Sequence, residues 1–98
     1  MEKIEVVYKE KARLSIQSIA MYIEENGYPE TSEKFAIKLF EFGDSLENFP
    51  NKYPLCKRKS LKRQNLKCAT FKKNYIFVYK LIETELVIYN VIHSKRLK

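Results

Sequence analysis

Glycine and proline are scarce in this chain of 98 residues, which has only 2 glycines and 3 prolines. Hydrophobic residues make up 45% of the sequence and charged residues 32%. A chain with so few helix breakers and so many apolar residues can bury a core, so the composition argues against disorder. The length predicts a single domain over residues 1–98.

Long hydrophobic runs are also missing. No apolar stretch approaches the roughly 18–20 residues that a transmembrane helix needs. The N-terminal residues, "MEKIEVVYKEK", lack the apolar stretch of a signal peptide. We therefore expect a cytoplasmic protein with no membrane partner.

Cysteine and histidine are rare as well. Cys56 and Cys68 fit no metal-ligand spacing, and His93 is the only histidine. We expect no metal site and no cofactor. Without a secretion signal, the sequence predicts that both cysteines are reduced thiols.

Acidic residues are scarce in one half of the chain only. Residues 1–51 contain 6 Lys/Arg and 10 Asp/Glu, whereas residues 52–98 contain 13 Lys/Arg and 2 Asp/Glu. The formal net charge of +7 therefore resides in the second half. Such an asymmetry indicates an anionic partner, which could be nucleic acid, an acidic protein, or both.

Two amphipathic helices are predicted in the first half, after a short strand over residues 4–8. The first helix spans residues 10–26, where apolar side chains recur at helical spacing, and Gly27 ends it. The second begins at Pro29 or Thr31 and reaches Phe49 before Pro50. Its apolar side chains advance by four and three residues: Phe35, Leu39, Phe42, Leu46 and Phe49. We expect this stripe to face the core.

Three strands are predicted in the second half, over residues 66–71, 75–81 and 86–92, after a basic loop over residues 51–65. The short turns between them favour antiparallel neighbours. The last two strands are apolar on both faces, which is typical of central strands covered by helices on one side and available to a partner on the other. The predicted fold is α+β in the order β-α-α-β-β-β: an antiparallel helix pair on one face of a small, mainly antiparallel four-stranded sheet.

Five segments of this sequence together resemble a known family. They are "AxxSIxxIAxYI" (12–23), "GYPETSEKF" (27–35), "LENFPNKYP" (46–54), "NYIFVYKL" (74–81) and "NVIHSKR" (90–96). As an ordered set covering nearly the whole chain, they are similar to the RelE/ParE superfamily of toxins from bacterial type II toxin–antitoxin systems. The helical half and the ending "VIHSKR" are closer to the ParE branch.

The resemblance implies two alternative activities. ParE-like toxins poison DNA gyrase, and RelE-like toxins cut messenger RNA on the ribosome; both are neutralised by an antitoxin, usually acidic. RelE-like nucleases often carry an arginine after the tyrosine of the penultimate strand, where this chain has Ile76 after Tyr75. They also often carry two lysines, one residue apart, where this chain has Lys67 and Ala69. These departures count against an enzyme, so we expect a gyrase poison. A family member that only binds its antitoxin is a third reading.

The candidate site residues lie in the second half. If the protein is a nuclease, His93 would transfer protons, Arg96 would bind the phosphate through its bidentate fork, and Lys67 would assist. His93 and Arg96 are three residues apart, so they could share one phosphate only if the strand turns after His93. The sequence also predicts a surface for anions or an acidic partner, formed by Arg58, Lys59, Lys62, Arg63, Lys67, Lys72, Lys73, Lys95 and Arg96.

Overall fold

The sheet and its two long helices form the framework in a computed structural model, which describes residues 3–25 and 29–94. The elements are β1 (Glu5–Tyr8), α1 (Glu10–Glu25), α2 (Pro29–Ser45), the 3-10 helix η1 (Leu46–Asn48), α3 (Lys59–Arg63), β2 (Lys67–Phe71), β3 (Tyr75–Ile82) and β4 (Glu85–His93). The strand order is β1-β4-β3-β2, with β1 parallel to β4 and the other neighbours antiparallel. This confirms the predicted α+β fold and element order, and α3 is an addition within the predicted loop.

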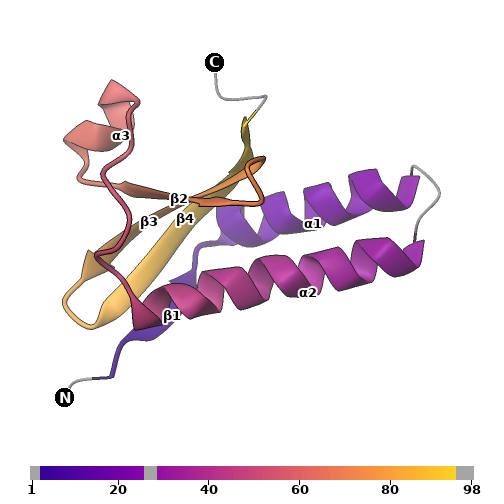
Figure 1. The fold of residues 1–98 in the computed structure, drawn as a ribbon, viewed down its shortest axis with the longest axis horizontal. Helices are drawn as coiled ribbons and strands as arrows, with labels where there is room; N and C mark the ends of the chain where they lie inside the picture. Colours follow the sequence, from indigo (N-terminus) through magenta and orange to yellow (C-terminus); the bar gives the residue numbers. More distant parts are fainter. Residues whose placement is uncertain (1–2, 26–28, 95–98) are drawn as a thin grey trace.

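The helix pair covers one face of the sheet. Figure 1 shows α1 and α2 running side by side. Ala12 and Ile16 of α1 and Leu39 of α2 are fully buried against Phe77 and Ile88 of the central strands. Burial of a leucine or isoleucine side chain contributes roughly 1.5–3 kcal/mol, so these contacts hold the hairpin on the sheet. The predicted burial of the apolar faces of both helices is confirmed at these residues.

The second helix ends earlier than the sequence predicted. The α-helix stops at Ser45, and the tighter η1 turn carries the chain to Asn48. Phe49 then takes a non-helical conformation and is 65% exposed, so it does not extend the buried stripe. The apolar spacing continued through Phe49, but the change of helical pitch turns its side chain away from the core.

The predicted loop of residues 51–65 contains a short helix, α3, closed by a hydrogen-bonded C-terminal turn. Asn65 adopts a positive φ of 61°, and its N–H donates to the Lys62 carbonyl. The Leu66 N–H donates to the Leu61 carbonyl over 3.1 Å, and both leucines join the same apolar cluster. This is the Schellman arrangement, with asparagine in the left-handed position usually taken by glycine.

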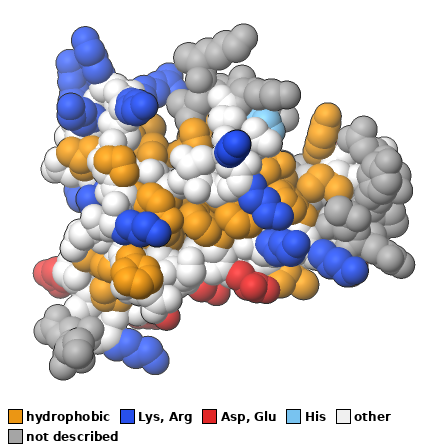
Figure 2. Space-filling model, viewed as in Figure 1, with side chains coloured by type: hydrophobic (Ala, Val, Ile, Leu, Met, Phe, Trp, Pro, Cys, Tyr) orange, Lys and Arg blue, Asp and Glu red, His pale blue; other side chains and the backbone are white. Residues whose placement is uncertain are grey.

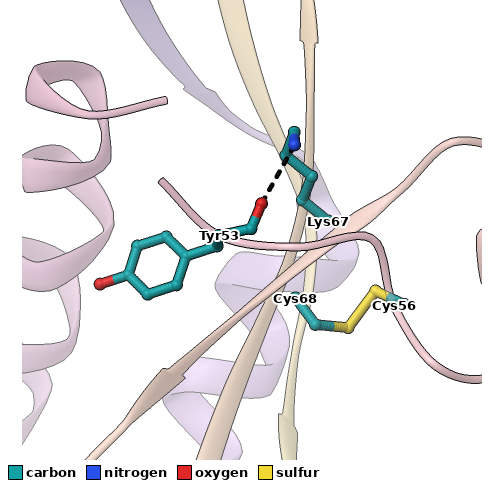
Figure 3. Close-up of a disulfide and its surroundings, with 4 residues drawn as sticks. All are labelled: Tyr53, Cys56, Lys67 and Cys68. Carbon is teal, nitrogen blue, oxygen red and sulfur yellow. Dashed lines mark hydrogen bonds between the residues drawn. A yellow bond between two sulfur atoms is a disulfide. The ribbon is translucent and has the colours of Figure 1, made fainter. Parts of the chain in front are cut away.

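The prediction of reduced cysteines is wrong for this structure, in which Cys56 and Cys68 form a disulfide with their Cα atoms 4.9 Å apart (Figure 3). The prediction considered only the compartment. Antiparallel pairing of Leu55 with Lys67 makes the flanking Cys56 and Cys68 diagonal neighbours on one face of the ladder, within the usual disulfide range.

The chain itself packs on the second face of the sheet. Cys56 and Leu66 are buried there against Val78, and partly buried apolar side chains surround them: Leu61, Cys68, Ile76, Tyr89 and Ile92. In Figure 1, α3 stands at the β2 side of the sheet, away from the helix pair. The apolar second faces of β3 and β4 are therefore explained, in part, by this segment.

Candidate functional site

A β-bulge in β4 decides which side chains face the helices near the end of that strand. Val78 pairs with Asn90, whereas the next residue of β3, Tyr79, pairs with Ile88, so Tyr89 is an extra residue in β4. Leu86 and Ile88 lie on the helix side, and strict alternation would put residue 92 there and residue 91 on the other face. Instead Val91 packs in the helix-side core and Ile92 in the cluster on the other face. The bulge thus reverses the alternation before His93.

A hydrogen bond from α1 braces the bulge. The Ser15 hydroxyl donates to the Asn90 side-chain oxygen over 2.6 Å, and the Val91 N–H donates to the same oxygen over 2.9 Å. Two donors therefore fix the asparagine amide between helix and strand. The sequence analysis did not identify Ser15 or Asn90, because the residues around each of them do not indicate a hydrogen-bond partner 75 residues away.

A groove of about 570 Å³ lies between α1 and the end of β4. Its walls are Lys11, Leu14, Ser15, Ser18, Ile19 and Tyr22 from α1, Tyr75 from β3, and Asn90, Val91, Ile92 and His93 from β4. None of these lining residues is acidic. Leu14 is 53% exposed and Tyr22 is 64% exposed, so apolar surface is available at the mouth.

Aromatic rings form one end of the groove. The His93 ring packs edge-on against Tyr75, with ring centroids 5.1 Å apart, and Tyr75 in turn packs against Phe35 of α2 at 5.1 Å. Burial, and secondarily the nearby Tyr22, raise the pKa of Tyr75 above its ordinary value. Tyr75 therefore stays neutral at physiological pH and presents its ring as a wall.

Lys67 lies far from His93 and serves a structural purpose. Its Nζ donates to the Tyr53 carbonyl oxygen over 3.0 Å, which ties the segment before α3 to β2 (Figure 3). Lys67 pairs with Tyr79, whereas His93 pairs with Tyr75, the partner of Phe71. His93 therefore lies four residues further along the sheet than Lys67 and two strands away. With ordinary strand spacings, these offsets put their Cα atoms roughly 16 Å apart. The two residues cannot act on one phosphate in this arrangement.

Three tyrosines of the second half, Tyr53, Tyr79 and Tyr89, pack against other side chains of the protein. Tyr79 is fully buried, its hydroxyl donates to the Pro50 carbonyl over 2.8 Å, and burial raises its pKa to about 12. Tyr89 packs in the cluster under α3. Tyr53, in the predicted loop, packs against Phe42 with centroids 6.4 Å apart.

Four of the nine residues of the predicted basic surface lie, together with Lys57, in one segment, residues 57–66, which we call the basic segment. Its five cations are all exposed: Lys57, Arg58, Lys59, Lys62 and Arg63. Figure 2 shows Lys and Arg side chains gathered where Figure 1 places α3. The structure thus brings these cations together on one end of the molecule.

The other predicted cations lie apart from the basic segment or outside the described part. Lys72 and Lys73 are exposed in the β2–β3 turn, both with positive φ, and the Lys72 Nζ lies 5.9 Å from the Phe35 ring centroid. Lys95 and Arg96 lie outside the described residues, so the predicted pairing of His93 with Arg96 stays a prediction. Among the residues described, no group of His, Cys, Asp and Glu could hold a metal ion.

Comparison with protein families identifies the chain. The family model described as "ParE toxin of type II toxin-antitoxin system, parDE" matches residues 6–98. The chain belongs to the ParE toxin family.

The solved structures agree on the fold. A chain described as "Chromosomal ParDE TA system from P. aeruginosa" superposes with a TM-score of 0.79, covering 92% of this chain and 95% of that one, at 13% sequence identity. At that identity the likeness shows the fold alone. A comparison with curated protein sequences finds no match. In the described part of this ParE-family chain, no helix is long and apolar enough to cross a membrane.

Membership of the ParE family confirms the resemblance seen in the sequence, including the choice of branch. It also makes the chain the toxin side of a toxin–antitoxin pair, so an antitoxin partner is implied. The α1–β4 groove was not predicted, because its lining comes from three elements that are far apart in sequence. The exposed apolar residues Leu14 and Tyr22 within a polar helix face were the one available signal.

Proposed function

We propose that this protein is a toxin that arrests growth by poisoning DNA gyrase in the cytoplasm. An acidic antitoxin neutralises it by placing an apolar segment in the α1–β4 groove. The observation that carries the proposal is the match of residues 6–98 to the ParE toxin family. The mechanism is binding, without a covalent step by the toxin.

The groove has the chemistry that such an antitoxin segment requires. Leu14, Ile19 and Val91 offer apolar contact, while Ser18 and Lys11 offer polar contacts at the rim. Because no lining residue is acidic, carboxylates of the partner meet no like charge there. The basic segment adds long-range attraction, which mainly speeds association.

The nuclease alternative has weaker support. A ribosome-dependent messenger RNA endoribonuclease built on His93, Arg96 and Lys67 needs its cationic groups around one phosphate. Lys67 instead donates a hydrogen bond to the Tyr53 carbonyl, and its position in the sheet is distant from that of His93. Ile76 and Ala69 occupy the positions where RelE-like nucleases often carry basic residues.

Pulse labelling after induction of the protein alone in bacterial cells tests the target. We expect DNA synthesis to fall before protein synthesis, and purified protein to inhibit supercoiling by gyrase. An earlier fall of protein synthesis would favour the nuclease and make His93 the first residue to mutate. Unimpaired growth with folded protein present would instead indicate a family member that only binds its antitoxin.

Arg96→Ala tests the C-terminal contact. We expect this change to abolish toxicity and to leave the melting temperature nearly unchanged, because arginine is suited to binding anions or a partner surface. Growth arrest and thermal unfolding are measured on the same variant. A variant that melts normally and still arrests growth would remove Arg96 from the site.

A further inference from the structure

The Cys56–Cys68 disulfide closes a loop that contains the whole basic segment. All five of its cations lie between the two sulfurs in sequence. Residues 57–65 are exposed apart from the half-buried Leu61, and the segment returns to the sheet at the buried Leu66. The bond therefore tethers this exposed, strongly basic part of the chain to the sheet.

Backbone contacts hold the two cysteines together independently of the sulfur bond. The Cys56 N–H donates to the Leu66 carbonyl over 2.9 Å, and the Cys68 N–H donates to the Pro54 carbonyl over 3.2 Å. Leu55 forms an isolated antiparallel bridge with Lys67 between them. When the bond is reduced, these contacts keep the thiols near each other, so the bond can form again within the folded protein.

The basic segment has few other attachments. Helix α3 is only five residues long, too short to be stable by itself. Its apolar contacts are Leu61 and Leu66 on the cluster that contains Val78. Removal of the disulfide leaves these contacts and the backbone pairs as the restraint, so we expect the segment to open locally more often.

We propose that Cys56 and Cys68 form a reversible redox switch that sets how rigidly the basic segment is presented. In a protein expected in the cytoplasm, a disulfide is more often transient or redox-sensing than permanent. The functional part rests on the proposed gyrase inhibition. A rigid segment binds an anionic surface more tightly because less conformational freedom is lost on binding, so the oxidised form is the stronger inhibitor.

The exchange partner is a small disulfide such as oxidised glutathione. The Cys68 thiolate, which is half-buried, attacks one sulfur of that disulfide, and one glutathione leaves as a thiolate. The Cys56 thiolate, 1% exposed as a residue, then attacks the Cys68 sulfur and releases the second glutathione thiolate. The protein loses two electrons and two protons, and the two released glutathione thiolates take up the protons to become thiols. Reduction is the same sequence reversed.

Alkylation measures the switch itself. The purified full chain is equilibrated in glutathione buffers from strongly reducing to strongly oxidising, quenched with acid, and unfolded in denaturant with iodoacetamide so that the buried Cys56 is also accessible. The mass of the protein is then measured by mass spectrometry. We expect a graded change from two alkylated cysteines to none. A bond that survives the most reducing buffer, or never forms in the most oxidising one, would overturn the proposal.

Hydrogen exchange measures the conformational consequence. We expect amides of residues 57–66 to exchange roughly tenfold faster or more in the reduced protein, while amides of β3 and β4 are unchanged. The double variant Cys56→Ser/Cys68→Ser should exchange like the reduced protein in either buffer. Equal exchange rates in the oxidised and reduced wild type would contradict the proposed effect of the disulfide on the basic segment.

Supercoiling assays test whether the redox switch changes the inhibition of gyrase. We expect the oxidised protein to halve gyrase activity at a severalfold lower concentration than the reduced protein. The double serine variant, assayed in both buffers, controls for effects of the buffer on gyrase. Equal inhibition by both forms would refute the functional link. If neither form inhibits gyrase, the gyrase proposal fails, while alkylation and exchange still decide the switch.

Discussion

At the scale of single residues, the packing of β1 on α2 depends on the tyrosine–glycine contact of Tyr8 with Gly43. Gly43 is buried inside α2, and a Cβ there would collide with the Tyr8 hydroxyl and lie 3.1 Å from Ile88 Cδ1. The Tyr8 oxygen lies 2.9 Å from both the Phe40 carbonyl and the Asp44 carboxylate, so its one proton is shared between two acceptors. A glycine at this position permits the ring to reach the helix backbone.

Gly43→Ala should therefore destabilise the protein by about 1–3 kcal/mol, as overpacking usually does. Helix propensity alone predicts the opposite sign, a gain of about 1 kcal/mol. Urea unfolding measures the difference. In a Tyr8→Phe background the colliding oxygen is gone, so the same Gly43→Ala change should cost less. Equal costs in the two backgrounds would mean that the Tyr8 contact does not matter.

The same tyrosine predicts a loss of stability at high pH. Burial, a hydrogen bond to Asp44 and the charge of Asp44 raise the pKa of Tyr8 far above 10.0, and burial raises that of Tyr79 to about 12. The folded protein keeps protons that the unfolded chain loses above pH about 10. The contribution of these tyrosines to the free energy of unfolding should be constant below that pH. Above it, the contribution should fall by at most about 1.4 kcal/mol per pH unit for each such tyrosine.

Urea unfolding between pH 8 and pH 11 checks this dependence. Tyr8→Phe removes one of the tyrosines whose pKa is raised, so the free energy of unfolding of this variant should fall less steeply with pH than that of the wild type. An equal slope in wild type and variant would show that Tyr8 does not hold its proton more tightly in the folded state.

At the scale of elements, α1 and the bulged end of β4 together make the groove. The bulge places Val91 and His93 on the helix side, and Ser15 locks it through Asn90. α1 also carries exposed apolar residues inside and outside the groove lining: Leu14 lines the groove, while Met21, 58% exposed and two turns further along the helix, does not. This pair offers a matched test of the proposed antitoxin contact.

Leu14→Glu should weaken neutralisation by the antitoxin by tenfold or more in affinity, because a carboxylate replaces an apolar contact and repels an acidic partner. Met21→Glu, at a similarly exposed position of the same helix outside the groove, should have little effect. Titration of each toxin variant with the cognate antitoxin, read as recovery of growth and as binding affinity, distinguishes them. Equal behaviour of the two variants would place the antitoxin elsewhere.

At the scale of the whole molecule, the uneven charge along the sequence concentrates cations on one part of the surface. The five exposed cations of the basic segment lie together on the second half of the chain, which carries 13 Lys/Arg against 2 Asp/Glu. Several like charges on one surface raise the local potential and speed the approach of an anionic partner. The same charges contribute little to the folded core, since all five are solvent-exposed.

Replacement of those five cations by glutamine should slow association with an acidic antitoxin about tenfold or more at low salt, and the difference should shrink as salt is raised. The melting temperature should stay the same or rise, because self-repulsion is reduced. Stopped-flow association at several salt concentrations measures the rate. The control neutralises five of the six cations of residues 1–51, sparing Lys11 of the groove. An equal slowing in the control would mean that net charge alone, rather than this surface, controls the rate.

The order and type of the main elements, the two amphipathic helices, the charge asymmetry and the family can all be inferred from the sequence alone. Each of these depends on patterns within a few residues or on counts along the chain. The spacing of Phe35, Leu39 and Phe42 was enough to place the buried face of α2. The resemblance to ParE toxins likewise rested on an ordered set of short segments.

The disulfide, the bulge, the groove and the position of Lys67 become visible only in the folded chain. Each depends on contacts between residues separated in sequence: the pairing of Leu55 with Lys67 brings the flanking Cys56 and Cys68 together, and Ser15 meets Asn90 across 75 positions. The face on which His93 lies follows from one extra residue in β4, and a single-residue shift in a strand reverses every side chain beyond it. Local periodicity carries no information about such a shift, because register is set by which strands meet.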